Sequence, residues 1–169
     1  AGGGATSVGL YAVAAAKACG ARAITYVDTS DARGAIATKL GATFVKERYR
    51  PDLRVGRFPI TVDATARPEG LRFCMQSTDA GGVVTSAGIY FGEVPLDLLD
   101  MYTRGVRFVT SRVDARREVG PALELVRRGL FDLAPIVTNI VDADDMPAAW
   151  LESATKVVAR HRGTRASTP

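Results

Sequence analysis

The sequence contains few of the residues that build metal sites and disulfide frameworks. Two cysteines, Cys19 and Cys74, and one histidine, His161, stand among its 169 residues. The cysteines lie far apart without a CxxC spacing, and the histidine lies in a polar, basic stretch near the C-terminal end. The composition therefore argues against a disulfide-stabilised fold and against a metal site built from this chain alone.

Long apolar runs and one-sided charge are missing as well. No run approaches the roughly 18–20 apolar residues of a membrane span, and no signal-peptide pattern is present. We therefore expect a cytoplasmic protein that does not bind a membrane. The 22 basic residues are scattered among 18 acidic ones and are not interleaved with aromatic residues, which argues against a nucleic-acid partner.

A glycine-rich stretch at 2–9 runs directly into an alanine-rich segment that ends at Gly20. Glycines let the backbone turn tightly and approach a ligand, and alanines favour a helix, so the stretch predicts a glycine loop that opens a helix. The free N–H groups at the start of such a helix attract anions, most often phosphate. The alternative is a glycine-rich turn before an ordinary core helix.

This loop departs from the strict dinucleotide fingerprint G-x-G-x-x-G at its middle position. If Gly4 and Gly9 are the outer glycines, the middle position is Thr6. A threonine side chain would crowd a pyrophosphate unless the loop is shaped to suit it.

A carboxylate at the expected offset supports the nucleotide hypothesis. The apolar, β-branched stretch 23–28 ends on Asp28, nineteen residues beyond Gly9. A nucleotide-binding unit places at this offset the acid that accepts hydrogen bonds from the ribose hydroxyls. The alternative for Asp28 is a turn or cap aspartate ahead of Ser30-Asp31, which is itself a plausible helix cap.

The rest of the chain alternates between helical and strand patterns, and its 47% of hydrophobic residues suffices for one sizeable core. We expect Gly81-Gly82 to turn the chain into a strand, and one helix to carry an apolar stripe of Leu96, Leu98, Leu99 and Met101. The order predicts an α/β fold with a doubly wound parallel sheet of the Rossmann type. The predicted helices lie at 30–40, 67–77, 95–104, 116–128 and around Trp150, and the strands at 42–45, 59–65, 83–89, 106–111, 134–141 and 155–158.

The sheet is expected to be incomplete. A doubly wound sheet begins with a central strand that leads into the glycine loop, and here only Ala1 precedes Gly2. With this first strand missing or truncated, its two neighbours would face a gap. We therefore expect the chain to be a fragment of a longer protein, or another segment to fill the gap.

Several stretches together resemble the cofactor-binding half of the medium-chain dehydrogenase/reductase family, especially its zinc-dependent alcohol dehydrogenases. They are 3–21, the Tyr-Val-Asp that ends at Asp28 with Arg33 five residues further on, 37–42, 62–65 and 81–89. The resemblance runs from Gly2 to about Val158. The order and spacing of the stretches, rather than any one of them, make it specific.

The resemblance implies a set of cofactor-binding residues. In the loop and helix start, the backbone would hold the pyrophosphate, and Asp28 would bind the adenosine ribose with Arg33 beside the adenine. The remaining residues would lie near the adenosine or the nicotinamide. The full set is Gly4, Thr6, Ser7, Val8, Gly9, Asp28, Arg33, Ala64, Thr65, Gly88, Ile89, Ser111 and Val113.

The resemblance also implies a division of labour with a second domain. Residues 1–133 would bind the dinucleotide, 134–159 would return to an absent catalytic domain that holds the zinc, and 160–169 would be a disordered tail. This chain would then contribute no catalytic residue of its own to hydride transfer between a small alcohol and its aldehyde or ketone. A free carboxylate at Asp28 would repel a 2′-phosphate and so favour NAD over NADP. One departure from the family is Ala66, which stands where glycine commonly follows Asp-Ala-Thr.

Three alternatives stay open at this point. The first is a zinc-free quinone or enoyl reductase of the same family, and the second is a truncated, non-catalytic nucleotide-binding fragment. The third is an S-adenosylmethionine methyltransferase, which also uses a glycine-rich loop and an acid after its second strand. A homo-oligomer formed through the edge strand at 106–111 is a further expectation, by analogy with relatives.

Overall fold

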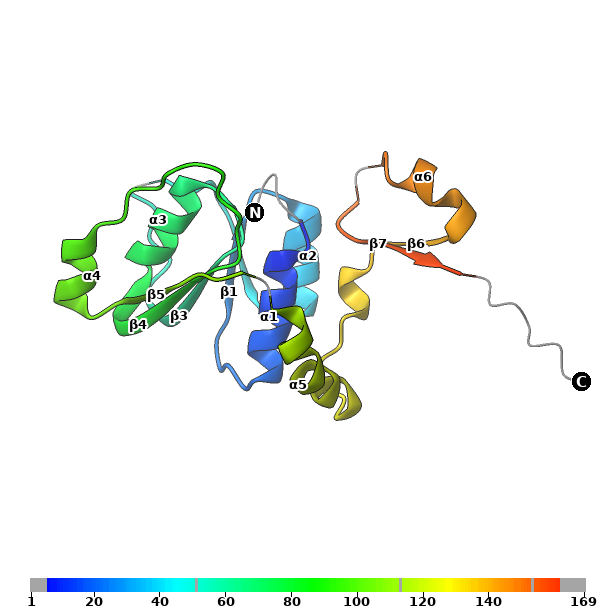
Figure 1. The fold of residues 1–169 in the computed structure, drawn as a ribbon, viewed down its shortest axis with the longest axis horizontal. Helices are drawn as coiled ribbons and strands as arrows, with labels where there is room; N and C mark the ends of the chain where they lie inside the picture. The colour runs from blue at the N-terminus through cyan, green and yellow to red at the C-terminus, as the bar shows by residue number, and fades with distance from the viewer. Residues whose placement is uncertain (1–5, 51, 113, 153, 162–169) are drawn as a thin grey trace, which may run out of the picture.

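The computed structural model describes residues 6–50, 52–112, 114–152 and 154–161. Helices and strands alternate along the chain, and each pair of neighbouring strands runs parallel. Figure 1 shows three groups of elements, with the β3–β5 sheet on the left, α1, α2 and β1 in the centre, and β6, β7 and α6 on the right. This is the α/β architecture with parallel strands that the sequence predicts.

The central group contains α1 (Val8–Ala18), β1 (Thr25–Asp28), α2 (Asp31–Lys39) and β2 (Thr43–Lys46). The two strands pair in parallel from Thr25 with Thr43 to Asp28 with Lys46. The helix α2 begins at Asp31 because the Ser30 side chain caps it, accepting a hydrogen bond from the Arg33 amide at 3.3 Å. The buried core of this group consists of Leu10, Val13, Ala14, Tyr26, Ile36, Ala37, Leu40, Ala42 and Ile136.

The second group is a sheet of β3 (Phe58–Asp63), β4 (Thr78–Ser86) and β5 (Arg107–Val109), in that order. The helix α3 (Pro68–Gln76) packs against β3 and β4, and α4 (Leu98–Arg104) packs against β4. Leu71, Met75, Val84 and Val106 form the buried core between them.

The two groups are not joined by backbone hydrogen bonds between strands. Among the described residues, β1 pairs with β2 and β3 pairs with β4, and no strand bonds to both sheets. The helix α1 contacts both α2 and β3 and so connects the groups through side chains. This arrangement agrees with the expected gap between the neighbours of a first strand.

The strand β4 differs from the prediction at its start. It begins at Thr78 and continues through Gly81 and Gly82, which we expected to form the turn before a strand. Its register against β3 jumps from Phe58 opposite Thr78 to Ile60 opposite Val83, so the glycines form an irregularity within the strand. Gly81 has a φ of +74°, a conformation that glycine adopts without strain.

The chain between 134 and 141 was expected to be one strand, and this is wrong for its first half. Ala134–Ile136 form a 3₁₀ turn, η1, and the strand β6 covers only Asn139–Asp142. Pro135 lacks an N–H donor for a sheet, and Ile136 is fully buried in the core of the central group, so packing favours a turn. A second 3₁₀ turn, η2 (Ala143–Asp145), leads into α6 (Met146–Ala149).

The strand β6 pairs in parallel with β7 (Val157–Arg160). This last strand includes Arg160, the first residue of the expected tail. Residues 162–169 lie outside the described residues.

The predicted apolar stripe of α4 is only half correct. Leu96 and Met101 pack against the core, whereas Leu98 and Leu99 are exposed. Asp97 caps the helix by accepting a hydrogen bond from the Asp100 amide at 2.9 Å, which moves its start to Leu98 and turns those two leucines outward.

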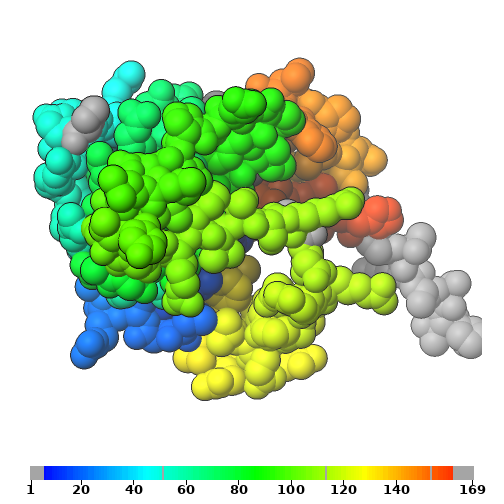
Figure 2. All heavy atoms as spheres, turned by 60° about the vertical axis from the view of Figure 1, so that its left-hand side comes forward, coloured from blue at the N-terminus to red at the C-terminus, as the bar shows by residue number. Residues whose placement is uncertain are grey.

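The helix α5 (Ala115–Arg127) has the predicted amphipathic pattern but no buried residue. Val119, Leu123 and Val126 are each about half exposed. Figure 2 shows this yellow-green to yellow helix at the bottom of the view, below the green α4 region. Within the described ranges, no helix is long and apolar enough to cross a membrane.

Candidate functional site

Polar side chains gather where the strands of the two groups end. Asp28 is the last residue of β1, Asp63 of β3 and Ser86 of β4. Carboxyl ends of parallel strands lie at one edge of a doubly wound fold, which is the edge where such folds bind ligands. The candidate site lies along this edge.

The start of α1 approaches this edge through a glycine. A Cβ atom added to Gly9 would lie 3.1 Å from the ring of Tyr26 and 3.7 Å from the Cβ of Ala64. Glycine at this position lets the helix start approach Tyr26 without a shift of the tyrosine ring. Ser7 precedes the helix and is buried, and Val8 is its first residue. Gly4, the other loop glycine of the prediction, lies outside the described residues.

The threonine in the loop is bonded to a distant part of the chain. The Thr6 hydroxyl donates a hydrogen bond to the backbone carbonyl of Thr155, at 3.1 Å. Its polar end is therefore occupied by the C-terminal part of the chain.

Asp28 is almost completely buried, with 1% of its surface exposed, and is surrounded by donors. The amides of Thr29 and Ser30 donate to Oδ1 at 2.7 and 3.0 Å. Arg33 donates from Nη2 to Oδ1 at 2.7 Å and from Nε to Oδ2 at 2.8 Å, and the Tyr26 hydroxyl donates to Oδ2 at 2.7 Å. Asp28 therefore fits both hypotheses from the sequence, because it accepts from the amides of the turn that follows it and also lies at the end of β1.

These contacts determine the protonation of the site. Burial by itself raises the pKa of Asp28, but hydrogen bonds from Arg33, Tyr26 and the Ser30 amide outweigh it and hold that pKa well below its usual range. Burial and the hydrogen bond to Asp28 raise the pKa of Tyr26. Asp28 is therefore a carboxylate and Tyr26 a neutral hydrogen-bond donor at neutral pH.

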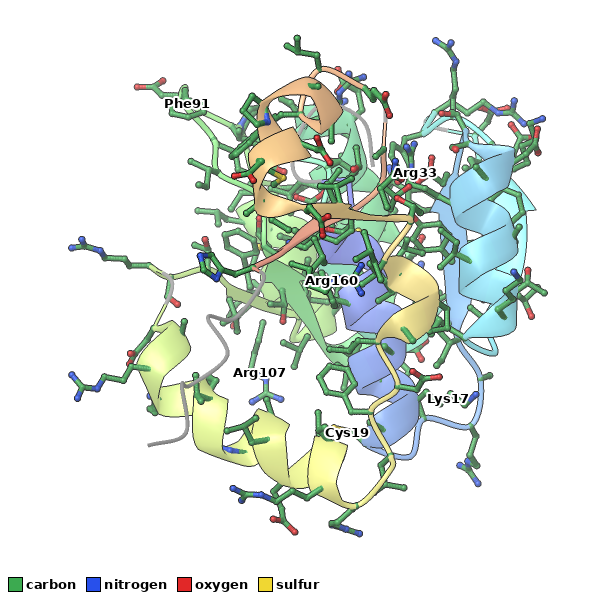
Figure 3. The ribbon with its side chains drawn as sticks, turned by 90° about the vertical axis from the view of Figure 1, so that its right-hand side faces the viewer. Lys17, Cys19, Arg33, Phe91, Arg107 and Arg160 are labelled. Atoms are coloured by element: carbon green, nitrogen blue, oxygen red, sulfur yellow. The ribbon has the colours of Figure 1, made fainter. Side chains whose placement is uncertain are left out.

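Arg33 stands between this carboxylate and solvent. Its side chain is 17% exposed, and it reaches Asp28 from the first turn of α2. Figure 3 shows Arg33 in the upper part of the view, well above Lys17 and Cys19, which lie at the C-terminal end of α1. The pair places one positive and one negative charge where the adenosine ribose is expected.

A second buried carboxylate, Asp63, was not singled out from the sequence. It is fully buried and accepts hydrogen bonds from the Thr65 amide at 3.0 Å, the Thr65 hydroxyl at 2.6 Å and the Ser86 hydroxyl at 3.4 Å. The Tyr90 hydroxyl donates to it as well. This network joins the loop after β3, which holds the predicted residues Ala64 and Thr65, to the loop after β4.

The loops after β3 and β4 also touch through their backbones. Ala66 has a φ of +54°. A Cβ added to Gly88 would lie 2.8 Å from the N and Cα atoms of Ala66. The family's glycine at position 66 thus has a physical reason, because glycine adopts positive φ without strain.

The residues predicted near the nicotinamide border a hollow of about 680 Å³. Gly88, Ile89 and Ser111 line it together with apolar side chains that include Leu71 and Phe108. Ile89 and Ser111 are exposed. Val113, the last predicted residue, lies outside the described ranges.

The comparisons with known proteins agree with this geometry. Residues 7–128 match the family described as zinc-binding dehydrogenase. The chain belongs to that family. It supplies the NAD(P)-binding domain of such an oxidoreductase, and the start of α1, Asp28, Asp63 and the hollow fall within the matched residues.

Individual zinc-binding dehydrogenases resemble the chain over most of its length. It is 30% identical over 168 residues to an L-threonine 3-dehydrogenase of Streptomyces coelicolor, covering 90% of this chain and 47% of the relative. The solved 2R,3R-butanediol dehydrogenase of Bacillus subtilis has 25% identity and a TM-score of 0.75, covering 88% of this chain and 46% of that one. An alcohol dehydrogenase from E. coli CFT073, complexed with NADH, shares the fold at 16% identity and a TM-score of 0.75, covering 94% and 49%.

The chain thus spans about half the length of the curated zinc-binding dehydrogenases that it matches. Within the part of the chain that the structure describes, no three His, Cys, Asp or Glu side chains come together as a metal site. These residues do not fit a zinc ion, so no chemical step through zinc follows from them.

Proposed function

We propose that the chain is the NAD(H)-binding domain of an alcohol dehydrogenase-like oxidoreductase. The enzyme would transfer hydride between a small alcohol, or the matching aldehyde or ketone, and the nicotinamide. The observation that carries the proposal is the close approach of Gly9 to Tyr26, directly beside a buried, ionised Asp28 at the end of β1. A glycine at a helix start and an acid at the next strand end are what a dinucleotide needs.

The described residues suggest a place for each part of the cofactor. The amides around Ser7 and Val8 would hold the pyrophosphate, Asp28 the ribose hydroxyls, and Ala64 and Thr65 would lie beside the adenosine. Gly88, Ile89 and Ser111 would border the nicotinamide, because they line the hollow at the same edge. When bound, the nicotinamide supplies the hydride chemistry, while this chain binds and orients it.

The charge at Asp28 supports NAD(H) over NADP(H). A buried carboxylate that stays ionised repels a 2′-phosphate, whereas it accepts hydrogen bonds from ribose hydroxyls. Arg33 offsets part of this charge in the unliganded site. Discrimination between NAD(H) and NADP(H) therefore depends on how the Asp28–Arg33 ion pair rearranges when the cofactor binds.

A second domain would carry the zinc and the substrate pocket. The match to about half of each relative supports a division in which residues 1–133 bind the dinucleotide and 134–159 lead toward the catalytic domain. Membership of the zinc-binding dehydrogenase family excludes the methyltransferase alternative. The description of the matched family favours the zinc-dependent type over a zinc-free reductase, and the names of the relatives, which are those of dehydrogenases, favour an enzyme over a non-catalytic fragment.

The test is NADH titration of purified wild-type protein and the Asp28→Asn variant, with Asp31→Asn as a matched control on an exposed carboxylate. We expect Asp28→Asn to weaken NADH binding about tenfold or more, because a charge-assisted hydrogen bond is lost, and to improve NADPH binding relative to NADH. Asp31→Asn should change neither. Failure of folded wild-type protein to bind NADH in the millimolar range would overturn the proposal.

A further inference from the structure

We propose that Tyr26 is a positioning residue that holds the Asp28 carboxylate in place while Arg33 leaves it and the ribose hydroxyls of the cofactor take the place of Arg33. This inference rests on the proposed function and adds a mechanism of cofactor selection to it. It follows from the number of donors on Asp28 and from the freedom of each donor to move.

Both oxygens of Asp28 are already occupied. Oδ1 accepts from the Thr29 and Ser30 amides and from Arg33, and Oδ2 accepts from Tyr26 and from Arg33. A carboxylate oxygen has about two lone-pair sites. The five described hydrogen bonds already exceed the roughly four lone-pair sites of a carboxylate, so a ribose hydroxyl cannot bind until Arg33, which donates to both oxygens, has left.

Arg33 is the donor that can leave. The amides of Thr29 and Ser30 belong to the backbone that enters α2, where Ser30 is the capping residue. Tyr26 is 6% exposed, and its ring is confined between Gly9 and the Phe44 ring, whose centroid is 6.4 Å away. Arg33 has a long, flexible side chain that reaches solvent at the rim of the site.

Once Arg33 has left, the Tyr26 hydroxyl still donates to Oδ2 of Asp28. This hydroxyl then fixes the rotation of the carboxylate, so that the ribose meets an acceptor that is already oriented. NADPH has different needs, because its 2′-phosphate repels Asp28 and would bind the released guanidinium of Arg33 instead. Tyr26 should therefore matter for NADH and little for NADPH.

The experiment compares NADH and NADPH dissociation constants for wild-type protein and Tyr26→Phe. This variant keeps the ring and removes only the hydroxyl. We expect NADH binding to weaken about five- to tenfold, the usual effect of losing one hydrogen bond of this kind, and NADPH binding to change less than twofold. Tyr49→Phe is the control, since Tyr49 is another largely buried tyrosine nearby, whose hydroxyl donates to the Val27 carbonyl at 3.0 Å, and it should leave the ratio unchanged.

The outcomes separate this inference from the proposed function. Equal losses for both cofactors, or no loss for either, would show that Tyr26 acts only in packing and would overturn the inference. Wild-type protein that binds neither cofactor would refute the proposed function itself. If Tyr26→Phe does not fold, Arg33→Gln tests the exchange itself, because removing the donor that must leave should strengthen NADH binding relative to NADPH binding, which loses its guanidinium partner. Equal losses in Arg33→Gln would contradict the exchange.

Discussion

Asp28 and Asp63 are two buried carboxylates at the ends of neighbouring groups of strands, and their donors differ in kind. Asp28 is bonded to a guanidinium, a phenol and two backbone amides. Asp63 is bonded to the hydroxyls of Thr65, Ser86 and Tyr90 and to one amide. Only Asp28 has a long charged donor at the rim, so only Asp28 is built to exchange a partner for a ligand, while Asp63 ties loops together.

The positive φ of Ala66 leads to a prediction about stability. A left-handed conformation costs an alanine about 1–2 kcal/mol, and the extra chain entropy of glycine offsets about 0.5–1 kcal/mol of that. Ala66→Gly should therefore raise the free energy of unfolding by about 0.5–1 kcal/mol in denaturant titrations.

Gly88→Ala is the contrasting variant. Its new Cβ would lie 2.8 Å from backbone atoms of Ala66, which cannot move aside easily, so this change should lower the free energy of unfolding. If Ala66→Gly destabilises the protein, the strain assigned to position 66 is absent.

The sequence pointed to the buried carboxylate Asp28 and to its partner Arg33, but not to the rest of the network around the strand ends. Asp28 was found because the offset from a glycine loop to an acid is set by the length of one helix and one strand. Tyr26 and Asp63 were missed, although a signal exists for Tyr26, since residues two apart in a strand point to the same face. The hydroxyl donors of Asp63 come from three separate segments, and local spacing carries no information about such a meeting.

At the scale of single elements, α2 lies on β2 through a glycine in mid-helix. A Cβ added to Gly34 would come within 2.2 Å of the Phe44 ring. We expect Gly34→Ala to destabilise the protein, because overpacking costs about 1–3 kcal/mol and outweighs the gain of about 1 kcal/mol in helix propensity.

A helix glycine without neighbours provides the control for this prediction. Gly120 lies in α5, and an added Cβ there would meet no atom within 4 Å. Gly120→Ala should change the free energy of unfolding little, because the gain of up to about 1 kcal/mol in helix propensity is offset by the contact of the new Cβ with Pro121, the next residue of the helix. Equal effects of the two variants in thermal or urea unfolding would mean that Phe44 moves freely.

Element types were predicted well where the apolar period and the caps agree, as in α2 and α3. The prediction failed where tertiary packing overrode the local pattern. Gly81-Gly82 are typical of a turn, yet β4 continues through them. The extra residues form an irregularity in the pairing of β4 with β3. Leu98 and Leu99 read as core residues, yet the cap at Asp97 rotates them into solvent.

At the scale of the whole molecule, the proposed cofactor bridges two sheets that share no backbone hydrogen bonds among the described residues. NADH should therefore slow amide hydrogen exchange in both groups at once, at the end of β1 and in the loop after β4. AMP is the matched control, because it carries only the adenosine end and should protect the β1 side alone. Protection by NADH confined to one sheet would contradict the placement of the nicotinamide beside Gly88.

The hydrogen bond from Thr6 to the Thr155 carbonyl joins residues 149 positions apart. During synthesis on the ribosome, N-terminal segments fold first at the pace of elongation, about 5–20 residues per second. At that rate, Thr6 is synthesised about 7–30 seconds before its hydrogen-bond partner Thr155. A nascent chain that stalls before Thr155 therefore lacks this hydrogen bond to Thr6 at the start of α1.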